Sequence, residues 1–263
     1  MRHIWRRARR PGRRGALRLL ATVIAGTALG VLSPTSRASA ATFTVDPTQI
    51  FLSSRAGSVL LTLHNQSTET LSFQLSVFSW AQAPDGQMQL QPTQDIVFFP
   101  PLVTLKPTET RRVRVGATTT FDAREKTYRI FVEELPPTDS PTSGVRVLTK
   151  MGIPIFLRPA KEIATATLSD LRQQQGSFRF SLSNTGTVHI MPRSITVRAL
   201  AGSTAAFERE LEGWYVLANS RRDFELELPK AACAQVTSIV VDIRFEAGMV
   251  QERLQTPSGA CPR

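Results

Sequence analysis

Short runs of alternating apolar and polar residues, separated by clusters of turn-forming residues, follow one another from residue 42 onward. Alternation with a period of two is typical of a β-strand with one buried face. In the first half of the chain it predicts seven strands, within residues 42–53, 57–67, 71–82, 95–105, 109–117, 127–137 and 143–159. A tight turn is predicted at "APDGQM", residues 83–88. Strands at about ten-residue spacing predict an immunoglobulin-like sandwich.

The second half repeats this organisation. Its expected strands lie within residues 162–171, 176–184, 189–200, 209–217, 221–229, 238–248 and 250–256. The turn "SNTGT" at residues 183–187 echoes "HNQST" at residues 64–68, each after the second strand of its half. We therefore expect an all-β chain of two sandwiches, residues 41–158 and 159–263. The short connection at Pro159-Ala160 predicts a fairly fixed angle between them.

The last expected strand of the first half, residues 143–159, alternates over an unusual length. As one strand, residues 145–157 would span about 40 Å, roughly twice the usual length. Its odd positions would share one face: Val145, Val147, Thr149, Met151, Ile153, Ile155 and Leu157. So long an apolar edge is expected to need a covering partner, or to self-associate when free.

The first 40 residues differ from the rest. Eight arginines lie within residues 2–18, a mainly apolar run extends from Leu17 to Leu32, and the small residues "ASA" occupy residues 38–40. A positive start, an apolar middle and a small-residue end predict a secretory signal peptide, cleaved after Ala40. A membrane anchor is the alternative, but the run is short and rich in Gly, Ala and Thr. The pair Arg13-Arg14 would also permit twin-arginine export.

Cleavage would change the charge of the protein. Nine of the 32 basic residues lie within residues 1–40, which leaves 23 basic against 21 acidic residues and lowers the net charge from +11 to +2. The basicity that would suggest nucleic-acid binding therefore belongs mainly to the exported segment. Cys233 and Cys261 are the two cysteines, and in an exported chain they are expected to form one disulfide.

The sequence contains none of the common catalytic motifs for hydrolases, metalloproteases or nucleotide-binding proteins. After residue 40 its histidines are His64 and His189, both beside expected turns, where a neutral structural histidine is the better account. We therefore expect no enzyme activity, no metal and no cofactor.

Charged residues mark the ends of three expected strands. Glu133 and Glu134 end the strand before Pro136, Arg158 ends the long strand, and Glu246 ends a late strand of the second half. An arginine fork at a domain junction could pair with two carboxylates. The alternative is three solvated surface charges, which contribute little to stability.

Four segments, in their order along the chain, resemble the PapD-like family, the periplasmic pilus chaperones of the chaperone–usher system. They are "TFTVDPT" (residues 42–48), "YRIFVEELPP" (128–137), "VRVLTKMGIPIFLRP" (145–159) and "RFEAG" (244–248). The resemblance covers essentially the whole chain after residue 40. It implies two immunoglobulin-like domains in a boomerang with a cleft between them.

The resemblance implies a function in the periplasm. The chaperone would donate alternate side chains of its edge strand to a pilin subunit that lacks its own final strand, and would deliver that subunit to an outer-membrane usher. The donor residues would be Val145, Val147 and Thr149, with Met151 and Ile153 following. The interdomain ion network of the family would consist of Glu134, Arg158 and Glu246.

The sequence departs from the family pattern at the anchor for the subunit's C-terminal carboxylate. Family members commonly use an arginine and a lysine at positions that here hold Gln49 and Pro154. Arg129 is the first candidate for a replacement anchor, with Lys150 and Arg114 as alternatives. Two other interpretations stay open, an immunoglobulin-like structural or adhesion protein of the cell surface and an exported enzyme on an all-β scaffold.

Overall fold

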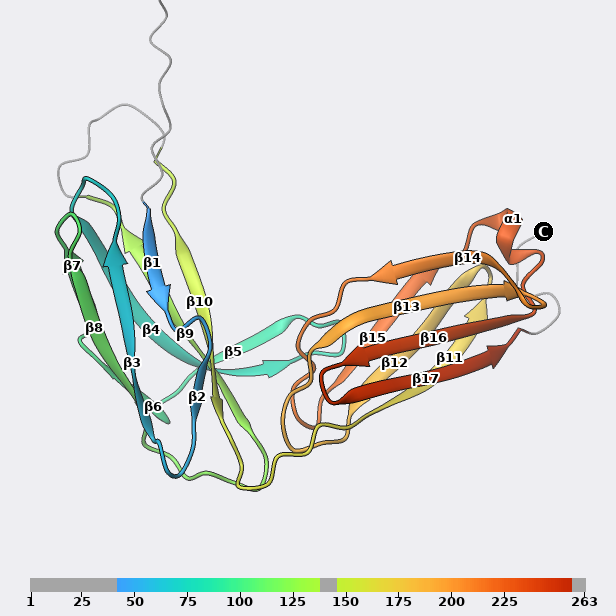
Figure 1. The fold of residues 1–263 in the computed structure, drawn as a ribbon, viewed down its shortest axis with the longest axis horizontal. Coiled ribbons are helices and arrows are strands. Elements are labelled where there is room, and N and C mark those ends of the chain that lie inside the picture. Colours follow the sequence, from blue (N-terminus) through green and yellow to red (C-terminus); the bar gives the residue numbers. More distant parts are fainter. Residues whose placement is uncertain (1–41, 138–145, 257–263) are drawn as a thin grey trace, which may run out of the picture.

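The computed structural model describes residues 42–137 and 146–256. The expected signal peptide, Val145 and Cys261 lie outside these residues, so the signal peptide and the disulfide stay predictions. The described chain forms two β-sandwiches that meet at an angle (Figure 1). The all-β, two-sandwich prediction is therefore confirmed. No helix among the described residues is long and apolar enough to cross a membrane.

The N-terminal sandwich contains strands β1 to β10. Their bounds are β1 Phe43–Asp46, β2 Ile50–Leu52, β3 Ser58–Asn65, β4 Leu71–Gln82, β5 Met88–Pro92, β6 Ile96–Phe99, β7 Leu102–Leu105, β8 Thr110–Ala117, β9 Lys126–Leu135 and β10 Lys150–Leu157. One sheet has the order β1-β3-β8-β6. The other has the order β2-β10-β9-β4-β5, with β7 also paired to β4.

Two expected strands are each divided between the sheets. Residues 42–53 become β1 and β2, and residues 95–105 become β6 and β7; in both cases the chain passes to the opposite sheet at a proline. Pro47 directly follows β1, and Pro100 directly follows β6. Proline has no N–H to donate to a strand ladder, so a strand ends readily there. The alternating pattern identified the strands but not these sheet changes.

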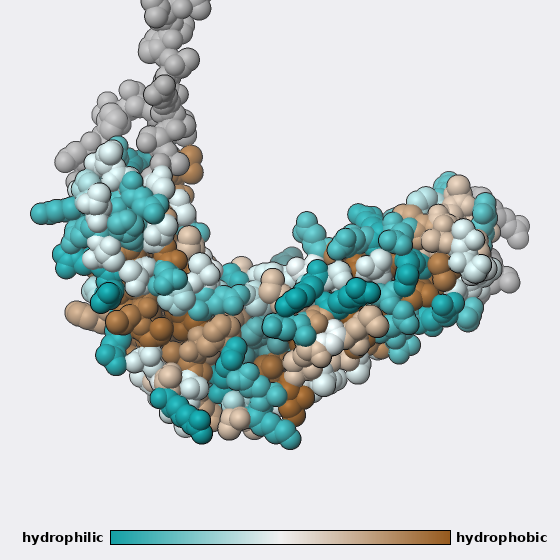
Figure 2. All heavy atoms as spheres, viewed as in Figure 1, coloured by the Kyte–Doolittle hydropathy of each residue, from teal (hydrophilic) through white to brown (hydrophobic). Residues whose placement is uncertain are grey.

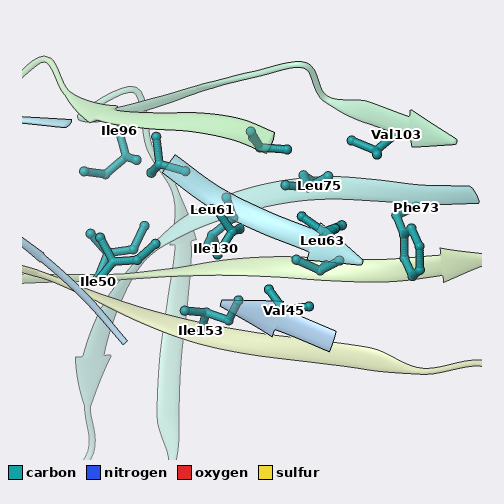
Figure 3. Close-up of a cluster of buried hydrophobic side chains, with 14 of the residues drawn as sticks. Val45, Ile50, Leu61, Leu63, Phe73, Leu75, Ile96, Val103, Ile130 and Ile153 are labelled. Atoms are coloured by element: carbon teal, nitrogen blue, oxygen red, sulfur yellow. The ribbon is translucent and has the colours of Figure 1, made fainter. Parts of the chain in front are cut away.

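The inner faces of the two sheets pack against each other. Figure 3 shows labelled side chains such as Leu61, Ile130 and Ile153 meeting between the sheets, and all three are at most 1% exposed. Burying one side chain of this size stabilises the fold by about 1.5–3 kcal/mol.

The C-terminal sandwich contains the remaining elements. They are β11 Ala166–Gln174, β12 Ser177–Asn184, β13 Pro192–Ala201, β14 Thr204–Leu211, β15 Arg221–Glu227, α1 Lys230–Cys233, β16 Ser238–Phe245 and β17 Gly248–Gln255. The sheets have the orders β11-β12-β15 and β14-β13-β16-β17. Phe178, Val197 and Ile239 belong to the core between them.

The echo between the two turn sequences has a structural basis. Asn65 and Asn184 each end the second long strand of their sandwich and are buried. The Asn65 amide donates to the carbonyls of Glu69, Leu105 and Lys106, and its Oδ1 accepts the N–H of Ser67. Asn184 donates to two carbonyls and accepts the N–H of Gly186 in the same way. Each asparagine thus satisfies backbone groups that the turn would otherwise leave buried and unpaired.

The expected long strand of residues 143–159 is shorter than predicted. Strand β10 begins at Lys150 and ends at Leu157, and Val147 forms only an isolated bridge before it. The ladder with β9 stops at the pair Lys150–Glu133. At the next position the Thr149 N–H donates to the side chain of Glu134 and not to its backbone carbonyl.

Substitution of Asn65 by Ala should lower the free energy of unfolding by about 2–4 kcal/mol, because several buried backbone groups would lose their partners. Chemical denaturation measures this change. Gln74→Ala, at an exposed position of β4, is the control and should change it by less than about 0.5 kcal/mol. Equal effects of the two substitutions would contradict the role assigned to Asn65.

Candidate functional site

One side of β10 is open. Strand β9 pairs with all of β10, whereas the short parallel strand β2 covers only Ile155–Leu157 on the other side. Among the described residues, no strand pairs with β10 from Lys150 to Pro154 on that side. This segment, with the extended residues before it, is called the free edge below.

The backbone groups of β10 alternate between its two sides. The Glu134 N–H donates to the Thr149 carbonyl on the β9 side, and the Arg158 N–H donates to the Leu52 carbonyl on the β2 side. Odd-numbered residues therefore bond to β9, and even-numbered residues point their N–H and C=O groups to the free edge. Pro154 is even-numbered, so its missing N–H removes no bond to β9. A proline is tolerated here for that reason.

The odd-numbered side chains change from buried to exposed along the strand. Ile153, Ile155 and Leu157 are buried in the core, Met151 is partly buried against it, and Val147 is 54% exposed. The prediction that Ile153 is a donor residue is therefore wrong, because the chain's own core occupies its side chain. Thr149 is partly buried, and Val145 lies outside the described residues.

The structure does not bring Glu134, Arg158 and Glu246 together. Strands β9 and β10 are antiparallel, so Glu134 near the end of β9 lies beside Thr149, whereas Arg158 follows the opposite end of β10. Nine residues of extended chain, about 30 Å, separate Thr149 from Arg158. Arg158 instead pairs with Glu162, and Glu246 approaches Arg193. The predicted ion network is therefore wrong as assigned.

A different carboxylate occupies the junction. Glu125 is buried and accepts hydrogen bonds from the backbone N–H of His189 at 3.0 Å and from its ring at 2.8 Å. The His189 ring stacks on Phe156 with centroids 3.9 Å apart. Glu125 lines one cavity of about 770 Å³ together with Arg158 and Glu246. His189 is thus a half-buried junction residue, which its position beside a turn did not indicate.

The β4–β5 hairpin also reaches the C-terminal sandwich (Figure 1). Gln82 donates its amide to the carbonyl of Tyr215 at 2.7 Å, and the Asp223 N–H donates to the carbonyl of Pro84 at 2.7 Å. Trp80 and Phe156 pack there against Tyr215 and Leu217. The two sandwiches are therefore connected by more than the linker.

Arg129 lies on the outer face of the β9 sheet, next to this junction. Its guanidinium carbon is 4.5 Å from the centre of the Trp80 ring and 5.3 Å from that of Trp214. Burial lowers the pKa of Arg129, and the nearby Tyr215 partly offsets this; an arginine nevertheless stays charged at neutral pH. Among the described residues no carboxylate pairs with it, and its Nε has no hydrogen-bond partner. A half-buried cation without an anion is an electrostatically incomplete arrangement.

Of the two positions where the family anchor is missing, one lies beside Arg129 and the other contacts Tyr215. Pro154 lies directly opposite Arg129 in the β9–β10 register. Gln49 donates its amide to the Tyr215 hydroxyl oxygen at 2.6 Å. Burial raises the pKa of Tyr215, so the hydroxyl keeps its proton and can donate a hydrogen bond. Arg129 and Tyr215 are therefore two donors in one place.

The two alternative anchors are placed less suitably. Lys150 already pairs with Glu133 at 2.7 Å. Arg114 lies on β8, in the opposite sheet, and donates to Ser58 on the exposed side. Neither faces the junction. No group of three or more potential metal ligands occurs within the part of the chain that the structure describes.

Comparisons with known proteins give a consistent result. Residues 42–162 match the family model described as "Pili and flagellar-assembly chaperone, PapD N-terminal domain". The class 5 fimbriae chaperone CfaA has a TM-score of 0.56 and 14% identity, covering 82% of this chain and 100% of CfaA. No curated protein matches the sequence.

Two further solved structures are similar in fold. One is the CsuC–CsuE chaperone–tip adhesion subunit pre-assembly complex of Acinetobacter baumannii, with a TM-score of 0.55 and 21% identity over 82% of this chain and 98% of the matched chain. The other is the E. coli chaperone DraB, with a TM-score of 0.51 and 19% identity over 84% of this chain and 98% of DraB.

Replacing Gln82 by Ala should loosen the contact between the sandwiches, because the Tyr215 carbonyl would lose its partner at the buried junction. We expect the free energy of unfolding to fall by about 1–2 kcal/mol, measured by tryptophan fluorescence, since Trp80 and Trp214 lie there. Gln89→Ala on the same hairpin, at an exposed position, is the control. A loss no larger than that of the control would contradict the role of the hairpin.

Proposed function

We propose that this chain, whose residues 42–162 match the family model of the pili and flagellar-assembly chaperones, is a member of that family and binds pilin subunits by donating a strand. The observation that carries the proposal is the free edge of β10. Its outward backbone groups have no strand partner among the described residues, and Val147 extends the core face of the strand into solvent. A subunit with an open groove would supply both the missing strand and the missing cover.

The donor residues follow from the exposure gradient. Val147 and Thr149 would enter the subunit, together with Val145, and Met151 would lie at the border between the two cores. Burying three side chains of this size would contribute about 5–6 kcal/mol before ordering costs. We also expect this open edge to favour self-association of the free protein.

The anchor for the subunit's C-terminal carboxylate is assigned to Arg129, with Tyr215 as the second donor. A carboxylate would complete the charge of the guanidinium and accept the hydroxyl hydrogen bond. This arrangement would replace the arginine and lysine that are absent at Gln49 and Pro154. The aromatic rings of Trp80 and Trp214 hold the guanidinium plane in position.

The wider role follows from the same assignment. The chain would be exported, lose residues 1–40 and act in the periplasm as a non-enzymatic chaperone. It would then pass its subunit to an outer-membrane usher.

Val147→Asp should abolish the complex between this chain and a pilin subunit co-expressed from the same gene cluster. A carboxylate would enter an apolar groove, which should weaken binding roughly 100-fold or more. Co-purification from periplasmic extracts measures the complex. Val97→Asp is the matched control, because Val97 is 52% exposed on the opposite sheet. An undiminished complex with Val147→Asp would overturn the donor-strand assignment.

Arg129→Met should weaken binding of a synthetic peptide of the subunit's C-terminal strand by roughly 10- to 100-fold, because a charged hydrogen bond is lost. The same peptide with a C-terminal amide should bind the wild-type chain as weakly as the free acid binds the variant. Calorimetry measures both. Arg114→Met is the control and should bind like wild type. If Arg129→Met prefers the free-acid peptide over the amide peptide as strongly as the wild-type chain does, the anchor lies elsewhere.

A further inference from the structure

Glu134 is a buried acidic residue of the N-terminal sandwich, at 2% exposure. It lies near the end of β9, away from the junction. Its Oε2 accepts the Thr149 N–H at 3.2 Å, while its own N–H donates to the Thr149 carbonyl at 2.9 Å. One residue therefore holds both backbone groups of Thr149 just before β10 begins.

Arg146 completes the arrangement. Its guanidinium lies 3.7 Å from Oε1 of Glu134 and 3.0 Å from a carboxylate oxygen of Glu69, in the loop before β4. Apart from Arg146, no cation among the described residues pairs with Glu134. If residues 146–149 left the sheet, the Glu134 carboxylate would stay at a buried site without a counter-ion. A buried charge without its partner is costly, so this geometry opposes that departure.

The neighbouring carboxylate provides a contrast on the same strand. Glu133 pairs with Lys150 at 2.7 Å, but both side chains are about half exposed. Exposed pairs of this kind add little stability. The strand therefore carries one buried and one solvated carboxylate side by side, and only the buried one contacts the backbone of the free edge.

We propose that Glu134, with Arg146, is a positioning residue that holds residues 146–149 in extended conformation for subunit binding. The inference rests on the proposed function and deepens it. Val147 and Thr149 lie within the held segment, before the regular ladder of β10 can order them. A segment that is already extended loses less conformational entropy when a partner strand adds to it. Glu134 and Arg146 would thus raise the affinity for the subunit without contacting it.

The test compares Glu134→Gln and Arg146→Ala with the matched control Glu133→Gln. The probe is the pilin subunit encoded in the same gene cluster, titrated against each purified chain. Glu134→Gln keeps an oxygen that can accept the Thr149 N–H but loses the charge. We expect roughly tenfold weaker binding for Glu134→Gln, about fivefold for Arg146→Ala and less than about twofold for Glu133→Gln.

A second measurement separates positioning from general destabilisation. In the free chain, hydrogen exchange of the Thr149 amide should accelerate about tenfold in Arg146→Ala, while the amides of Ile130 and Val132 in the core of β9 stay unchanged. Because Arg146 is not in the core, Arg146→Ala should fold even if Glu134→Gln does not, and the test can still be made. Uniform acceleration of all these amides would assign Glu134 and Arg146 a merely structural role and overturn the inference.

Subunit binding by the wild-type chain and by the variants distinguishes failure of the proposed function from failure of the role assigned to Glu134 and Arg146. If the wild-type chain binds no subunit, the proposed function fails, and the inference fails with it. If the wild-type chain binds and Glu134→Gln and Arg146→Ala bind equally well, the inference alone is overturned and the donor-strand proposal stands.

Discussion

A sheet edge that is paired on one side and open on the other is the constraint on which the rest of this structure depends. Strand β10 is held by β9 along its whole length, while β2 protects only its last residues. Buried aliphatic side chains hold the C-terminal half of β10 in the core, and Val147 continues the same face beyond the core. An open edge of this kind is a liability in a free protein. In the proposed function, a strand of the pilin subunit would complete this edge.

The junction between the sandwiches places Arg129, the proposed carboxylate anchor, beside that edge. Trp80, Phe156 and Tyr215 pack together, and the β4–β5 hairpin fastens the C-terminal sandwich. This packing leaves Arg129 half-buried and without a carboxylate partner among the described residues. In Figure 2 the two lobes meet around a concave side with mixed polar and apolar surface. A strand arriving along β10 would bring its terminus toward Arg129.

Much of the fold could be predicted from the sequence, because alternating apolar residues and turn-forming residues are local signals. The passage of the chain from one sheet to the other at Pro47 and Pro100 could not be predicted. The alternating pattern shows which side chains are buried, but not to which sheet each strand belongs. The ion network failed for a different reason. Glu134 and Arg158 both end strands, but in an antiparallel pair the two ends lie far apart. Glu125 and His189 lie in different sandwiches and are far apart in the sequence, so no local sequence pattern indicates their contact. Arg129 was a candidate through the family resemblance, and its role as an anchor stays a proposal, whereas its neighbour Tyr215 was identified only in the structure.

Amide exchange along β10, with and without the bound pilin subunit, tests the central claim most directly. The outward N–H groups belong to even-numbered residues, so strand addition should protect the amides of Leu148, Lys150 and Gly152. Those of Met151 and Ile153, which already bond to β9, should change little. Protection that alternates in this way would support strand donation at the free edge. Protection without alternation, or none on β10, would contradict it.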